Sequence, residues 1–153
     1  MSQHVMWAKP GFEINQAIQD FLAGGDIVLD QELFLYDIQA SKAHATGLSR
    51  IGVLSQSENE QLQVQLDSLA NLFQQGQFIL DARFEDGHSA IEQYLTEQLG
   101  DIGKKIHTGR SRNDQVLVAS RLWLKHQLKN LVVHCKAISA TALQRAESEA
   151  LTP

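Results

Sequence analysis

The sequence predicts an all-α protein, and three observations indicate this class. Apolar residues recur every three or four positions in several segments, which is the spacing of one helix face. No segment alternates apolar and polar residues in the way that a half-buried strand does. The longest stretch without Gly or Pro, residues 110–152, is long enough to form one continuous helix.

The N-terminal part is predicted to hold a short helix behind an irregular arm. A Pro-Gly turn falls within residues 1–12, and residues 13–22 have helical apolar spacing. A pair of glycines would end that helix, and Asp26 or Asp30 could cap the next one.

Two helices follow, and they are predicted to form an α-hairpin. The first covers residues 30–48, and the second starts at a capping box of Ser57 and Glu60 and ends at Gly76. One face of the first helix carries apolar and small residues: Leu33, Tyr36, Ala40, Ala43 and Gly47. The second helix carries an apolar stripe: Leu62, Leu66, Leu69 and Phe73. The small residues of the first face would let another helix approach closely.

A shorter helix is predicted after the hairpin. Residues 78–80 are too short an apolar run to assign, and residues 81–87 form a charged connector. Residues 88–99 again have helical apolar spacing, and Gly100 and Gly103 are the predicted stop signals.

The last predicted helix, residues 114–151, would span about 55 Å if it were fully helical. Its predicted inward side consists of Val116, Ser120, Trp123, Gln127, Leu131, His134, Ile138 and Ala142, widened by Leu117, Leu124, Leu128 and Cys135. A helix of this length exceeds a compact domain of this size. Part of its apolar side therefore needs a partner, which would be another chain or further residues of a longer protein.

Composition argues against several classes of function. The chain has 13 Lys and Arg against 18 Asp and Glu, and this net charge of −5 does not suit a general nucleic-acid or anionic-membrane surface. Cys135 is the only cysteine, so the chain has no internal disulfide and no cysteine-based zinc site. Neither a signal peptide nor an apolar run of about 20 residues is present. We therefore expect a cytoplasmic protein.

Residues 106–115, Ile-His-Thr-Gly-Arg-Ser-Arg-Asn-Asp-Gln, concentrate polar functional groups where the long helix should start. Arg110 and Arg112 carry planar forks suited to carboxylates, and backbone N–H groups at a helix start already favour an anion. Asn113 could cap the helix or donate its amide to a ligand. A capped helix start and a carboxylate-binding loop both remain open, and the two arginines with His107 favour the loop.

A second polar cluster, Glu-Asp-Gly-His-Ser, occupies residues 85–89. An acid beside a histidine can tune a proton-transfer group. Asp86 could instead serve as an N-cap while Glu85 complements the helix dipole, and the residues by themselves favour this second interpretation. The cluster has no metal-ligand spacing. Histidines elsewhere, such as His44, are interpreted as structural.

Residues 106–115 closely resemble the signature of the argininosuccinate lyase/delta-crystallin branch of the fumarase/aspartase superfamily. Residues 37–44, Asp-Ile-Gln-Ala-Ser-Lys-Ala-His, resemble the N-terminal helices of that family. Residues 85–92 resemble its acid-acid-x-His segment followed by a Glu, and residues 121–124, Arg-Leu-Trp-Leu, resemble part of its first long helix. The resemblance extends over nearly the whole chain, with the segments in the same order.

The resemblance implies a fold and a reaction. Residues 1–113 would form an N-terminal helical lyase domain, and residues 114–153 would be the first long helix of a central bundle, cut short. The family cleaves argininosuccinate to arginine and fumarate by β-elimination in arginine biosynthesis, with no metal or organic cofactor. Its members are cytoplasmic homotetramers. The implied partners are argininosuccinate and other copies of the chain, and neither nucleic acid nor a membrane.

The resemblance also implies roles for individual residues. Asn113 matches a substrate-binding residue, and further substrate-binding matches lie beside it: Arg112, Ser111 and Thr108. Three residues match supporting positions near the active site: Asp86, His88 and Arg110. Asp26 stands where many members have a substrate-contacting serine. An aspartate cannot contact a substrate carboxylate in the same way, so no binding role is transferred to Asp26.

The family's catalytic histidine and serine lie in segments that residues 1–153 do not contain. The histidine belongs to a Gly-Tyr-Thr-His segment and the serine to a mobile Ser-Ser-x-Met-Pro-x-Lys loop. We therefore expect an N-terminal portion of a lyase, with no catalytic residue and no turnover of its own. One alternative is a non-catalytic, crystallin-like structural protein that kept the loop. Another is a different lyase of the superfamily, such as one acting on adenylosuccinate.

Overall fold

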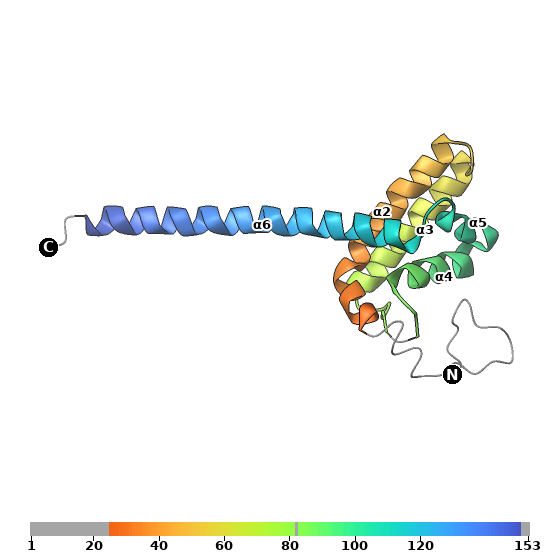
Figure 1. Ribbon diagram of the computed structural model, residues 1–153, viewed down its shortest axis with the longest axis horizontal. Helices are drawn as coiled ribbons and strands as arrows, with labels where there is room; N and C mark the ends of the chain where they lie inside the picture. The colour runs from red at the N-terminus through yellow and green to blue at the C-terminus, as the bar shows by residue number, and fades with distance from the viewer. Residues whose placement is uncertain (1–24, 82, 151–153) are drawn as a thin grey trace. The chain divides into compact units, whose positions relative to one another are not determined.

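The computed structural model describes residues 25–81 and 83–150, and within them it contains helices and no strand. The elements are α2 (Asp26–Arg50), α3 (Gln56–Gln74), α4 (Gly87–Leu99), α5 (Asp101–Lys104), the 3₁₀ helix η1 (Lys105–His107) and α6 (Arg112–Glu149) (Figure 1). The all-α prediction is confirmed. The arm and helix predicted over residues 1–22 lie outside the described residues. None of the described helices is long and apolar enough to cross a bilayer.

The chain divides into two units, residues 1–120 and residues 121–153. The first unit contains α2 to α5, η1 and the first residues of α6, and the second contains the rest of α6. The predicted domain boundary between residues 113 and 114 stays a prediction.

Helices α2 and α3 form the predicted hairpin and supply much of the core of the first unit (Figure 1). Leu62, Leu66 and Leu69 of α3 are fully buried, which confirms the predicted stripe. On α2 the predicted face is only partly right: Ala40 is buried, but Ala43 is exposed and Leu33 is only half-buried. The buried residues of α2 are Phe34, Asp37, Ile38, Ala40, Ser41, Ala45 and Leu48. Two polar residues, Asp37 and Ser41, lie on the buried face, so apolar spacing does not identify it.

The start of α3 is fixed by a capping box of Ser55 and Glu58, two residues earlier than the predicted Ser57 and Glu60. Ser55 is the N-cap: its Oγ accepts from the backbone N–H of Glu58, and its own N–H donates to Glu58 Oε2 at 2.8 Å. The sequence Ser-Gln-Ser-Glu-Asn-Glu fits the pattern in both frames. Glu58 also accepts from Lys105 Nζ at 2.5 Å, and this bond is the main reason that its pKa falls to about 2.

Replacing Ser55 with alanine should lower the free energy of unfolding by about 1 kcal/mol, because the first turn of α3 loses its side-chain acceptor. Ser57→Ala is the matched control, since Ser57 lies inside the helix and its change should be within about 0.5 kcal/mol. Urea denaturation followed by circular dichroism compares the two variants. A larger loss of unfolding free energy for Ser57→Ala than for Ser55→Ala would show that the capping box predicted from the sequence, Ser57 and Glu60, is the one that forms.

Helix α4 buries Ile91 and Leu95, as expected from the helical apolar spacing of residues 88–99, and its C-cap is Gly100. The prediction that Gly103 is a stop signal is wrong, because Gly103 lies inside the additional short helix α5. A Cβ atom on Gly103 would lie 2.3 Å from the backbone carbonyl carbon and oxygen of Leu95. The glycine is therefore required where α5 approaches the backbone of α4.

An aromatic cluster packs the connector between α3 and α4 against the hairpin. The ring of Phe78 stacks on those of Phe34 and Phe84, with centroids 5.7 and 5.6 Å away, and meets Tyr94 edge-on at 6.0 Å. The connector is thereby held against α2 and α4 just before the polar residues that precede α4.

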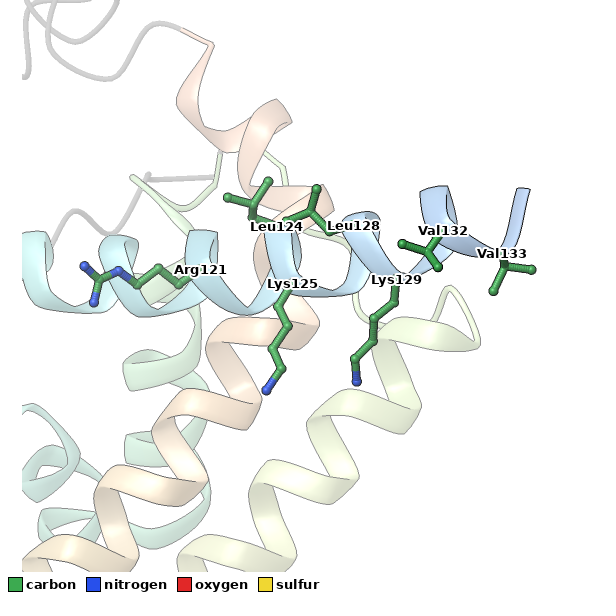
Figure 2. Close-up of a pocket in the computed structure, with 7 residues that line it drawn as sticks. All are labelled: Arg121, Leu124, Lys125, Leu128, Lys129, Val132 and Val133. Carbon is green, nitrogen blue, oxygen red and sulfur yellow. The ribbon is translucent and has the colours of Figure 1, made fainter. Parts of the chain in front are cut away.

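Helix α6 starts two residues before the predicted residue 114 and is continuous to Glu149. In its first turns the buried residues are Gln115 and Ala119, whereas Val116, which was predicted to face inward, is 44% exposed. In the second unit Leu124, Leu128 and Val132 line an open apolar surface beside Lys125 and Lys129, as Figure 2 shows. Two residues of the predicted inward side, Leu131 and Ile138, are 55% and 70% exposed there.

Candidate functional site

Residues 106–113, from within η1 to the start of α6, are anchored at the first residue and mostly exposed from Thr108 onward. Ile106 is 2% exposed and belongs to the hydrophobic core. Thr108 and Gly109 are exposed, and Gly109 has φ +72°, a conformation that favours glycine. The chain therefore turns sharply at Gly109 and presents residues 108–113 at the surface of the first unit.

The start of α6 is capped by Ser111 and Asp114. Asp114 Oδ2 accepts both the backbone N–H and the hydroxyl of Ser111 at 2.8 Å, and the N–H of Asp114 points back to Ser111 Oγ at 3.4 Å. The backbone hydrogen bond from Ser111 is the largest of the effects that lower the pKa of Asp114. Helix capping therefore accounts for these two residues.

Asn113 is not the cap that the sequence allowed it to be. It lies in the first turn of α6, its side chain is exposed, and that side chain makes no hydrogen bond with any residue that the structure describes. Its amide is available to a ligand, beside the exposed Thr108 and the N-terminal backbone of α6. The interpretation of Asn113 as a helix cap is therefore wrong, and its role in binding a ligand stays a prediction.

Arg112 is already bound to carboxylates of the chain itself. Its two terminal nitrogens donate to the two carboxylate oxygens of Glu85 at 2.6 and 3.0 Å, and Nη1 lies 3.2 Å from Asp86 Oδ2. Hydrogen bonding to Glu85 raises the pKa of Arg112. A substrate carboxylate would have to share this guanidinium with Glu85, so the geometry assigns Arg112 first to holding α6 against the start of α4.

The start of α4 has two carboxylate caps. Asp86 is the N-cap and accepts the backbone N–H and hydroxyl of Ser89 at 2.7 and 2.6 Å, which agrees with its interpretation as a cap. Asp30 accepts the backbone N–H of Gly87 at 2.7 Å. The prediction that Asp26 or Asp30 caps its own helix is wrong, because Gly25 is the N-cap of α2 and Asp30 lies one turn further along, facing α4.

His88 is buried and paired with an aspartate distant in the sequence. It is 8% exposed, and its Nδ1 is hydrogen-bonded to Asp37 Oδ2 of α2. Burial lowers the pKa of His88, but the hydrogen bond to Asp37 and the charges of Asp37, Asp86 and Asp30 outweigh it, so the pKa is raised. The sequence suggested His88 and its neighbouring acids, but no signal in the sequence marked Asp37 as its partner.

Hydrogen bonds of Arg110 and His44 join the exposed segment at residues 108–113 to α2. Arg110 donates to the carbonyl of Ile106 at 3.0 Å and lies 3.4 Å from Ser41 Oγ, and burial lowers the pKa of its guanidinium. His44 Nε2 is hydrogen-bonded to the carbonyl of Thr108 at 2.9 Å. Burial, followed by the charge of Arg110, lowers the pKa of His44. The two contacts hold both ends of the turn at Gly109.

No group of three or more His, Cys, Asp or Glu in the described ranges has a geometry that would hold a metal ion. The site therefore consists of an exposed amide and hydroxyls on a segment whose arginines are bound internally. Together these features define an all-helical protein with an exposed polar segment at the start of a long helix. Comparison with known proteins identifies the family to which this helical protein belongs.

The chain belongs to a family of lyases, whose family model, described as "Lyase", matches residues 25–153. It is 57% identical over 150 residues to a protein of Xanthomonas axonopodis pv. citri (strain 306) named argininosuccinate lyase, covering 98% of this chain and 35% of that protein. A protein of the same name from Stenotrophomonas maltophilia (strain R551-3) is 55% identical over 145 residues, covering 95% of this chain and 34% of that protein. The chain thus spans about a third of the length of these relatives, and the resemblance predicted from its motifs is confirmed.

Proposed function

We propose that this chain supplies a substrate-carboxylate-binding segment to a lyase that cleaves argininosuccinate into arginine and fumarate. The observation that carries the proposal is the exposed amide of Asn113, which has no partner among the described residues and lies at the start of a helix. The family and the relatives named argininosuccinate lyase support it.

The reaction explains why such a segment is needed. A base removes a proton from the carbon next to one carboxylate of the succinate part, and the electron pair is held as a dianionic aci-carboxylate. The pair then forms the carbon–carbon double bond of fumarate while the bond to the guanidinium nitrogen breaks, and an acid protonates that nitrogen. Donors placed around the aci-carboxylate stabilise the added charge. We assign the Asn113 amide to this role, assisted by the hydroxyl of Thr108 and the N–H groups that begin α6.

The assembly in which this occurs is part of the proposal. We infer that residues 1–113 form a helical domain and that residues 114–153 enter a central helical bundle of a cytoplasmic homotetramer. The exposed apolar side of α6 supports this, because Leu124, Leu128 and Leu131 are about half-exposed in the described chain. The acid and base would come from segments resembling Gly-Tyr-Thr-His and Ser-Ser-x-Met-Pro-x-Lys, which residues 1–153 lack. We expect the isolated chain to have no turnover.

The test is a product analysis with the full-length polypeptide that carries this chain. It is incubated in parallel with argininosuccinate and with adenylosuccinate, and fumarate and the second product are quantified. Arginine and fumarate in equal amounts from argininosuccinate alone support the proposal. Activity on adenylosuccinate alone assigns a different lyase reaction, and no turnover of either compound assigns a crystallin-like structural role; both outcomes overturn the proposal.

A further inference from the structure

The start of α4 is the meeting point of four carboxylates and two cations from three helices. Asp30 and Asp37 come from α2, Glu85 and Asp86 directly precede α4, His88 lies in its first turn, and Arg112 begins α6. The proposed substrate-binding role uses Asn113, the neighbour of Arg112, but it leaves the buried pair of Asp37 and His88 unexplained.

Asp37 and His88 are the buried part of this group, at 2% and 8% exposed. The groups facing His88 are Asp30 and Asp37 from α2 and Asp86 at the N-cap of α4, whereas α6 contributes the apolar Val116 and Ala119. These helices enclose a cavity of about 10 Å³, which has room for about one water molecule. Asp37 Oδ1 and His88 Nε2 are buried and have no hydrogen-bond partner among the residues that the structure describes.

A continuous series of contacts leads from this pair to Arg112. Asp37 holds His88, the second residue of α4, and Asp30 accepts the N–H of the preceding Gly87 at 2.7 Å. The residues before Gly87 are Asp86 and Glu85, and their carboxylates bind Arg112 at 3.2 and 2.6 Å. The placement of Arg112 thus depends on where the first turn of α4 is held.

We propose that Asp37 is a positioning residue: through His88 it fixes the first turn of α4, and thereby the two carboxylates that hold Arg112 and the start of α6. The effect of Asp37 on substrate binding rests on the proposed function. The effect of Asp37 on the position of Arg112 does not, because it depends only on contacts within this chain.

The physical basis is the high cost of leaving one member of a buried ion pair alone. If Asp37 loses its charge, or His88 its proton, the other member of the pair is left as a buried charge without its oppositely charged partner. Because the folded-state pKa of His88 is raised, the pair contributes its full stabilisation at pH values below the ordinary pKa of histidine. That contribution is lost as the pH rises through the raised value.

The test uses NMR spectroscopy on the 153-residue chain with Asp37→Asn, which keeps a hydrogen-bond acceptor and removes the charge. Hydrogen exchange of the Ser89 and Ala90 amides should accelerate by about tenfold or more, and the Arg112 side chain should become more mobile. Asp67→Asn is the matched control, because Asp67 forms an exposed ion pair with Lys42 on α2 and lies outside the series. Unchanged Ser89 and Ala90 exchange and an unchanged Arg112 in Asp37→Asn would overturn the proposal.

A titration of the unsubstituted chain keeps the test decisive if Asp37→Asn does not fold. The ¹⁵N shifts of His88 should titrate above the ordinary pKa of histidine, and Arg112 should gain mobility as His88 loses its proton. A His88 whose pKa is not raised, or an Arg112 whose mobility does not follow the titration, contradicts the proposal. In the full-length polypeptide Asp37→Asn should raise KM for the substrate, and a null result in that assay alone, with the NMR effects present, would count against the proposed function and not against the positioning role.

Discussion

Asn113→Ala in the full-length polypeptide should lower kcat/KM for argininosuccinate by about 10² to 10³, the usual cost of removing one donor from the developing oxyanion. The fold should be nearly unaffected. The Asn113 side chain is exposed and has no hydrogen bond among the described residues, and alanine is the better helix former. The free energy of unfolding should therefore change by less than about 0.5 kcal/mol. Steady-state kinetics and urea denaturation on the same preparation measure both quantities.

Ser111→Ala is the companion variant for stability. Because Ser111 caps α6 through Asp114, its replacement should cost about 1 kcal/mol of stability, which Asn113→Ala should not. Asn113→Asp tests the charge, because a carboxylate of the same shape would repel a substrate carboxylate and should reduce activity further than alanine does. Wild-type kinetics in Asn113→Ala, or a stability loss equal to that of Ser111→Ala, would show that Asn113 has only a structural role.

Gly103→Ala should destabilise the first unit by about 3 kcal/mol or more, the upper range for an added methyl group that packing cannot accommodate. The new Cβ would lie 2.3 Å from the carbonyl carbon and oxygen of Leu95 and 2.5 Å from the backbone nitrogen of Thr96. These are backbone atoms of α4, so no side chain can move aside. Helices α4 and α5 would have to separate, and Leu95, which is fully buried, would lose part of its packing.

Gly47→Ala is the matched control for this substitution. Gly47 lies within α2, and apart from its chain neighbours and the adjacent backbone of its own helix, no atom is within 4 Å of the position of its added Cβ. The same change should therefore stabilise the chain by up to about 1 kcal/mol, because alanine favours the helix and restricts the unfolded chain. Equal unfolding midpoints for the two variants in urea would mean that α5 does not pack on α4 as described.

Features with a local cause could be predicted from the sequence. The stripe of Leu62, Leu66 and Leu69 follows helical spacing, and Gly76 and Gly100 end their helices, because spacing and backbone freedom depend on few neighbouring residues. The segment 106–115 was also identifiable, since its composition is unusual and its motif resembles that of a known family.

Features that depend on distant residues could not be predicted. The buried face of α2 includes Asp37 and Ser41, which are polar because they meet His88 and Arg110 from later parts of the chain. Two capping frames were possible at α3, and Lys105 contacts the glutamate of the frame that formed. Asp30 looked like a cap of its own helix because nothing local reveals that it faces Gly87, a residue 57 positions later in the sequence.

The most direct measurement is a crystal structure of the full-length polypeptide, inactivated by substitution outside residues 1–153, with argininosuccinate bound. The Asn113 amide nitrogen should lie about 3 Å from an oxygen of a substrate carboxylate, with Arg112 still joined to Glu85. A substrate whose carboxylates are bound elsewhere, while Asn113 faces solvent, would contradict the assignment of this segment to substrate binding.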